Sequence, residues 1–315
     1  MNPHAPADSA VDPAAATAAT GGLLTAAAWR ARAAAHAARV DRYVVPHLER
    51  REAGVKHPVF DFLFTYYSHR PAQLRQWHPG AGVVLEDGGE YAGLKGYSLR
   101  ADGGVAVDPA FVVERRGLIE QLHRLLVATA GRAPQLGCFG LHEWAMVHRS
   151  AEHGVRHDAW PLRLGAEGTD AVVENHRIAC SHFDAFRFFT PTAVSLNTLS
   201  PGRDDREAFE QPGCLHAGMD LYKHAFRLSP LICSDLVMDA FELAWEIRIM
   251  DMRAAPYDFG GVDLGEHGTW TPIRIETPQG RRDYAEAQRG FAERGAPIRA
   301  RLVAACERLL RSANT

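Results

Sequence analysis

Histidine and carboxylate side chains recur at helical spacing in the apolar segment from residue 213 to residue 251. His216, Asp220 and His224 lie four and eight residues apart, which places them on one face of a helix over two turns. Asp239 and Glu242 follow in the next predicted helix. Because imidazole nitrogen and carboxylate oxygen together suit iron, manganese or zinc, these five residues are candidate ligands of a divalent metal.

The two helices that carry these residues are predicted to pack as an antiparallel hairpin, since only a Ser-Pro dipeptide separates them. Counting outward from the turn brings His224 near Asp235, Asp220 near Asp239, and His216 near Glu242 or Glu246. Imidazoles and carboxylates would then meet in layers. The alternative is a chain of hydrogen-bonded ion pairs that only satisfies buried polar groups.

A second segment, CFGLHEWAMVHR, sets His142 and Glu143 among large apolar side chains. It lacks the HExxH zinc signature because Met146 stands where the second histidine is required, and His148 lies about 240° from His142 around a helix. Glu143 is a candidate catalytic carboxylate whose pKa burial would raise, with His142 beside it and Trp144 as an aromatic wall. The alternative is a Glu143 that is paired with a neighbouring arginine.

A third segment, CSHFDAFRFFTP, is predicted to be extended, which puts His182 and Asp184 on one face of a strand. A general base beside its orienting carboxylate would have this arrangement. Phe183, Phe186 and Arg187 are candidate substrate-binding residues around the pair. The same aromatic side chains could instead fill a hydrophobic core.

Composition limits the classes of protein to consider. The chain has 315 residues, 46% of them hydrophobic and 23% charged, with a net charge of −3. A negative net charge provides no overall positive field for gripping nucleic acid. No run approaches the ~20 apolar residues that span a bilayer, and five widely spaced cysteines suggest reduced thiols. We therefore expect a cytoplasmic protein with no membrane partner.

The chain is predicted to form one mainly helical domain (α+β) over residues 22–315, preceded by a disordered Ala/Pro-rich tail at residues 1–21. The segment GVVLEDGGEYAGLKGYSLRADGGVAVD, with its Gly and Asp-Gly turns, predicts a small antiparallel β element. Helical periodicity and capping signals predict helices over residues 23–52, 109–129, 213–228, 231–254 and 281–312.

Five segments together resemble a bacterial family labelled 3-methyladenine DNA glycosylase: HPVFDFLFTYYSHRPAQLRQWHPG, LGCFGLHEWAMVHR, CSHFDAFRFFTP, EQPGCLHAGMDLYKHA and DMRAAPYDF. The resemblance covers about residues 55–300. It implies an N-glycosidic hydrolase that removes an alkylated purine base from DNA.

Such an enzyme holds the base against aromatic side chains and aims a water with a carboxylate. The candidates are Trp144, Phe183, Phe186 and Tyr257 for the base, with Glu143 or Asp184 for the water. The chain has no apolar helix-hairpin-helix motif with a Gly-rich turn before a catalytic aspartate. Its absence, like the lack of net positive charge, favours a free nucleoside or another small nucleobase-like substrate.

Three hypotheses for the function follow. The first is the N-glycosidic hydrolase that the resemblance implies. The second is a metal-dependent enzyme of small-molecule metabolism, with His216, Asp220 and His224 as ligands and helical carboxylates completing the shell. The third is a non-catalytic ligand-binding protein whose ionic stripes are structural. The sequence indicates no protein partner.

Overall fold

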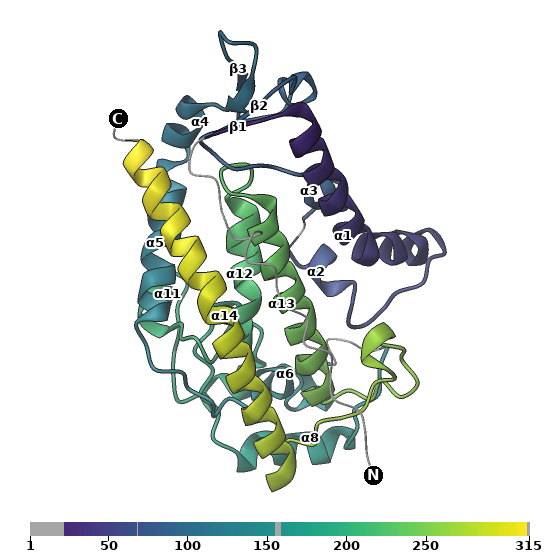
Figure 1. Ribbon diagram of the computed structural model, residues 1–315. Coiled ribbons are helices and arrows are strands. Elements are labelled where there is room, and N and C mark those ends of the chain that lie inside the picture. Colours follow the sequence, from purple (N-terminus) through teal and green to yellow (C-terminus); the bar gives the residue numbers. More distant parts are fainter. Residues whose placement is uncertain (1–21, 68, 155–158, 314–315) are drawn as a thin grey trace, which may run out of the picture.

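Two helices, α12 (Leu215–Arg227) and α13 (Ser234–Ala254), form the centre of the fold. They pack side by side as the predicted antiparallel hairpin, so the first turn of α12 lies beside the last turns of α13 (Figure 1). Gly218 allows the close approach, because a Cβ at this position would lie 2.8 Å from the Ile247 side chain. The contact between the two helices is therefore apolar.

The computed structural model describes residues 22–67, 69–154 and 159–313. The predicted tail at residues 1–21 lies outside the described residues. Within the described ranges the fold is mainly helical with a small four-stranded sheet, as the sequence predicts. None of the described helices combines the length and the hydrophobicity that a membrane crossing requires.

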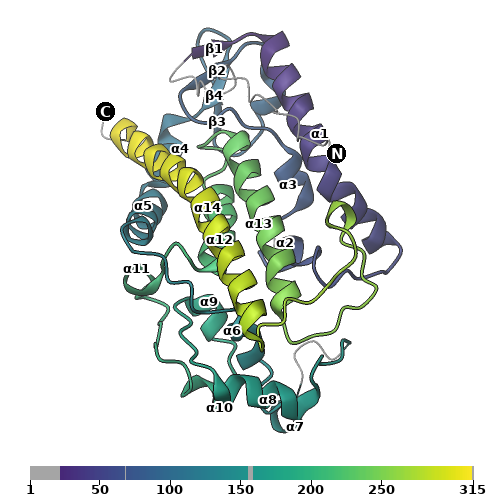
Figure 2. The same cartoon turned by 60° about the horizontal axis from the view of Figure 1, so that its bottom comes forward.

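Two long helices flank the central hairpin. Helix α14 (Pro278–Ser312), which Thr277 caps at its N-terminus, crosses α12 and α13 on one side (Figures 1 and 2). Helix α1 (Ala26–Glu52) lies along α13. The sequence predicts α1 from residue 23, but Thr25 accepts a hydrogen bond from the Ala28 N–H and so starts the helix three residues later.

The sheet has the order β1-β2-β4-β3, with strands β1 (Gly22–Leu24), β2 (Val83–Leu85), β3 (Tyr97–Leu99) and β4 (Val105–Val107). The pairs of β4 with β2 and with β3 are antiparallel, as predicted. Strand β1 adds a parallel edge against β2, with Gly22 opposite Val83. The sequence pattern missed β1 because its three residues precede a much longer helical pattern.

Shorter elements complete the chain. They are α2 (Phe62–Thr65), α3 (Pro71–Arg75), η2 (Gly89–Tyr91), α4 (Pro109–Glu114), α5 (Arg116–Ala130), α6 (Leu141–Ala145), α7 (Ser150–His153), α8 (Gly165–Asn175), α9 (Phe183–Phe186), α10 (Pro191–Val194), α11 (Arg206–Phe209) and η3 (Gly265–His267). Helices α6, α8, α9 and α10 gather at the end of the hairpin where α12 begins and α13 ends (Figure 2).

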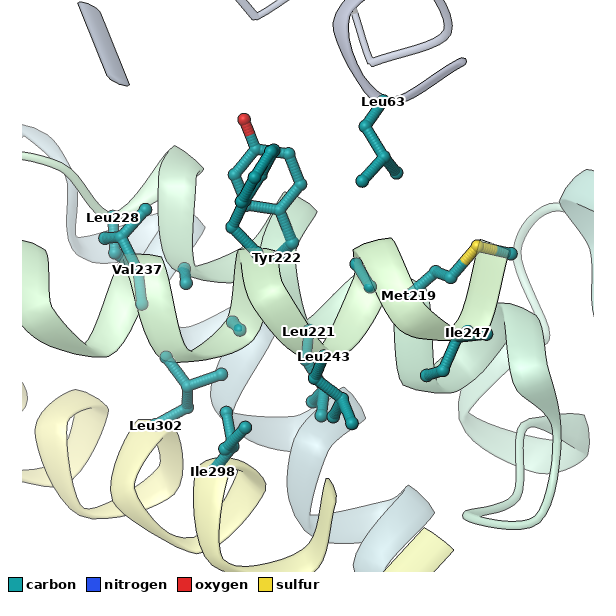
Figure 3. Close-up of a cluster of buried hydrophobic side chains, with 14 of the residues drawn as sticks. Leu63, Met219, Leu221, Tyr222, Leu228, Val237, Leu243, Ile247, Ile298 and Leu302 are labelled. Atoms are coloured by element: carbon teal, nitrogen blue, oxygen red, sulfur yellow. The ribbon is translucent and has the colours of Figure 1, made fainter. Parts of the chain in front are cut away.

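One hydrophobic cluster extends from Trp29 on α1 to Leu309 on α14 and surrounds the hairpin. Figure 3 shows its centre, where Leu221 of α12 and Leu243 of α13 meet Ile298 and Leu302 of α14. The apolar contacts occupy the surfaces by which these helices touch. Charged groups on the hairpin must therefore face other elements, or lie buried at its end.

Candidate metal centre

The backbone before α6 adopts an unusual conformation at the end of the hairpin. Phe139 has φ 49° and Gly140 has φ 70°, so both lie in the left-handed region. For a bulky residue such as Phe139 this conformation is strained, and strain of this kind concentrates at functional sites. The turn directs the chain inward, and His142 and Glu143 follow it as buried residues.

His142, His216 and Asp251 meet at this end of the hairpin. Each offers one ligand atom, and the three atoms lie within 4.8 Å of one another. The residues come from α6, the first turn of α12 and the last turns of α13. His142 Nε2 lies 3.4 Å from Asp251 Oδ1, and the two imidazole rings are 4.5 Å apart at an angle of 86°. We refer to these residues as the His142–His216–Asp251 triad.

The triad is buried, and three of its polar atoms lack hydrogen bonds in the described part of the chain. Asp251 has no exposed surface, and neither of its oxygens accepts a hydrogen bond from any described residue. His142 Nε2 lacks a hydrogen-bond partner in the same part of the chain. A buried carboxylate without hydrogen bonds is costly unless a cation compensates it. A protonated His142 at 3.4 Å and Arg248 at 3.8 Å can supply that positive charge, and so can a bound metal ion.

The pKa values of the triad residues depend strongly on one another's charges. Burial lowers the pKa of His142, but the Asp251 carboxylate outweighs burial and holds this pKa well above its usual value. Burial and the charge of His142 hold the pKa of His216 well below its usual value. Without a metal, His142 is therefore protonated and His216 is neutral. A metal ion would displace the His142 proton, so its affinity should increase with pH.

Glu143 and Arg248 form an ion pair next to the triad. Arg248 Nη1 lies 3.5 Å from Glu143 Oε1 and 3.8 Å from Asp251 Oδ2. The guanidinium stacks over the Phe62 ring at 3.9 Å from its centroid. Glu143 is thus paired with an arginine, which is the alternative that the sequence left open for it.

A second set of histidine and carboxylate side chains lies next to the triad. Arginine and lysine side chains already neutralise its carboxylates. His182 Nε2 lies 3.4 Å from Asp220 Oδ2 and 3.5 Å from Glu210 Oε1. Arg206 donates to both carboxylates, and Lys223 Nζ lies 3.2 Å from Asp220. These side chains form a buried ion-pair network.

Asp184, another predicted catalytic residue, belongs to the same ion-pair network. Lys223 also donates to Asp184 Oδ2 at 2.8 Å, and Tyr67 donates to Asp220 Oδ1 at 3.1 Å. Burial raises the pKa of Asp220, but Lys223 and His182 outweigh it and hold the pKa well below its usual value. Asp220 is therefore ionised at neutral pH.

The predicted layers of imidazole against carboxylate are wrong. Asp239 pairs with Arg39 at 2.8 Å and with Arg301 at 2.6 Å, and Glu242 pairs with Arg39 at 2.6 Å. The carboxylate stripe of α13 faces α1 and α14, because apolar side chains occupy its contact with α12. His216 meets His142 and Asp251 instead.

Of the five predicted ligands, only His216 belongs to the triad. Asp220 lies in the ion-pair network, and His224 is buried with its Nδ1 unpartnered in the described structure. Burial lowers the pKa of His224 to about 3. Asp239 and Glu242 form surface ion pairs.

The extended conformation predicted for CSHFDAFRFFTP is also wrong, because α9 forms a helical turn there. His182 precedes this turn and points toward Asp220, whereas Asp184 points toward Lys223. The two side chains therefore do not act as a base and its orienting carboxylate. Arg187 covers the Phe188 ring at 4.3 Å.

The aromatic candidates divide into buried and partly exposed groups. Trp144 and Tyr257 have no exposed surface, and the Trp144 indole donates to the Ala254 carbonyl at 2.9 Å. Both rings thus belong to the core in the described conformation. Phe183 and Phe186 are half-buried, and Phe186 packs edge-on against Phe189.

Asp251 is not among the ligands that helical spacing predicts. It stands between Met250 and Met252 on the buried last turns of α13, and an aspartate in such surroundings is rarely buried without a partner. This was the available signal. His142 was considered only as a companion of Glu143, because the HExxH test looks for a second ligand on the same helix.

Comparisons of the chain with protein-family models, curated proteins and solved structures find no significant match.

Proposed function

We propose that the protein is a metal-dependent enzyme whose active centre is the His142–His216–Asp251 triad. One observation carries the proposal: three ligand atoms from three different helices lie within 4.8 Å of one another, with the Asp251 oxygens buried and without hydrogen bonds among the described residues. Residues that only stabilise a core seldom leave a carboxylate in this condition.

Two histidines and one carboxylate are a ligand set for zinc or iron(II), and manganese also accepts these donors. Three protein ligands leave coordination positions for water and substrate. A metal in such a site lowers the pKa of bound water to about 7, which supplies hydroxide at neutral pH. Hydrolysis of a small-molecule substrate is the reaction that this chemistry favours.

Thermal unfolding of chelator-treated protein tests the proposal. Zinc at about 100 times its dissociation constant is expected to stabilise the protein by about 2.7 kcal/mol, which corresponds to a rise of roughly 4 °C in Tm. The rise should disappear in Asp251→Asn. Asp258→Asn is the matched control, since Asp258 is exposed seven residues further on and should retain the full rise. No rise in the wild-type protein with zinc, manganese or iron(II) would refute the proposal.

N-glycosidic hydrolysis is the second candidate, and the position of Glu143 favours it. Glu143 is 6% exposed and shares Arg248 with Asp251, so a carboxylate able to aim water lies beside the triad. Release of free base from alkylated DNA and from alkylated nucleosides would identify this activity. A chelator separates the two candidates, because only a metal-dependent hydrolase would lose activity in its presence.

Under the third hypothesis, a non-catalytic ligand-binding protein, a protonated His142 takes the place of a metal ion in the triad. The imidazolium of His142 would neutralise Asp251 and no metal would be needed. In that case Asp251→Asn should lower the free energy of unfolding without any dependence on added metal.

A further inference from the structure

A cavity of about 500 Å³ opens next to the triad. Its walls come from the strained turn before α6, the end of α8 with the residues after it, and the first turn of α14. The lining residues are Gln135, Gly137, Cys138, Phe139, Asn175, His176, Arg177, Ala179 and Arg281. The volume lies within the range of roughly 300–1,000 Å³ that is usual for small-molecule sites.

The charged lining of the cavity is entirely basic. It contains Arg177 and Arg281 and no aspartate or glutamate. Arg177 is exposed, and its guanidinium has neither a hydrogen bond nor an ion pair with another described residue. Arg281 donates to His176 Nε2 at 2.9 Å and to the Ile275 carbonyl at 3.1 Å. Both arginines therefore remain uncompensated by any carboxylate.

His176 adds a neutral hydrogen-bonding side chain beside the two arginines. Its Nδ1 donates to the Val172 carbonyl at 2.7 Å, so Nε2 is the nitrogen that accepts from Arg281. This pair of contacts fixes the tautomer and holds the Arg281 guanidinium in place. A guanidinium held in this way is pre-organised for an incoming anion.

Cys138 connects the cavity with the triad. Its side chain lines the cavity, and its Sγ lies 3.7 Å from His142 Nδ1. His142 Nε2, on the opposite side of the same ring, faces Asp251. A molecule in the cavity would thus lie one side chain away from the proposed metal.

We propose that this cavity binds a small organic anion, which Arg177 and Arg281 hold by its carboxylate or phosphate group. The remainder of the molecule extends toward Cys138 and the triad. The assignment rests on the proposed function in so far as it makes this anion the substrate of the metal centre. Binding of the anion itself requires no metal.

Alkylation of Cys138 by two matched reagents tests the proposal. Bromoacetate is an anion and bromoacetamide is its neutral counterpart; in both reactions the thiolate sulfur bonds to the methylene carbon and bromide leaves. The rate at each cysteine is measured by mass spectrometry of peptides from chelator-treated and zinc-loaded protein. The ratio of the bromoacetate rate to the bromoacetamide rate at Cys138 is expected to be at least about tenfold higher in the wild-type protein than in the double variant Arg177→Gln/Arg281→Gln, because the arginines concentrate the anion.

Arg177→Gln alone should lower this ratio by a smaller factor, because Arg281 still lines the cavity. Arg289→Gln is the control, since Arg289 is exposed on α14 and does not line the cavity. Acetate and inorganic phosphate should each slow the bromoacetate reaction, and the stronger inhibitor indicates which anionic group the site prefers. The same ratio at Cys138 in the wild-type protein and in the double variant would overturn the proposal.

The outcome is independent of the metal proposal. A preference in protein that binds no metal would leave the anion cavity standing and remove the metal-dependent function. Metal binding by protein that shows no such preference would leave the metal-dependent function standing and remove the anion cavity.

Discussion

Replacing His216 by alanine is expected to lower the affinity of the protein for its divalent metal by more than about 100-fold. Removing a group that only supports a metal ligand usually costs about 10–100-fold in affinity, and His216 would itself supply one of the three ligand atoms. A competition titration of zinc against a chromophoric chelator measures the change directly.

His224→Ala is the matched control for this experiment. His224 lies on α12 two turns after His216, is similarly buried, and stands outside the triad. The His224→Ala variant should bind zinc as the wild-type protein does. Equal affinity in His216→Ala and the wild-type protein, or equal losses in the two variants, would show that His216 is not a ligand.

Replacing Asp220 by asparagine is expected to lower the free energy of unfolding at pH 7 by about 1–3 kcal/mol. The reason is that Arg206 and Lys223 would each lose one of two carboxylate partners, whereas Glu210 and Asp184 remain. Asp239→Asn is the control, because Asp239 is partly exposed and a surface pair contributes about 0–1 kcal/mol. Chemical denaturation of the three proteins measures both differences.

The dependence of this effect on pH follows from the lowered pKa of Asp220. A carboxylate whose pKa is lower in the folded than in the unfolded state stabilises the protein above the unfolded pKa of about 3.9. That contribution disappears as the pH falls through the folded pKa. The difference between the wild-type protein and Asp220→Asn should therefore be constant from about pH 7 to pH 5 and shrink below about pH 4. A difference that grew on acidification would contradict this account.

The main helices could be predicted because their signals are local. Asp108 before Pro109 marks the start of a helix, and the structure begins α4 at Pro109 with Asp108 as its cap. The predicted helix over residues 109–129 is nevertheless broken at Arg115, after which α5 begins. No capping signal in the sequence marks that break.

The site was harder to predict because its residues come together only through tertiary packing. The spacing of His216, Asp220 and His224 correctly describes one helix face, but it cannot say which neighbour the face meets. Arg39 and Arg301, far away in the sequence, take the carboxylates of α13. His142 and His216 therefore meet a carboxylate at the end of the hairpin and not along its length.

Elemental analysis of untagged protein, purified without chelator, tests the central claim most directly. The account predicts near-stoichiometric zinc, iron or manganese in the wild-type protein, and its loss in His142→Ala, His216→Ala and Asp251→Ala. Protein that contains none of these metals, and that binds none of them when they are added back, would contradict the account and leave the triad as a buried ion-pair cluster.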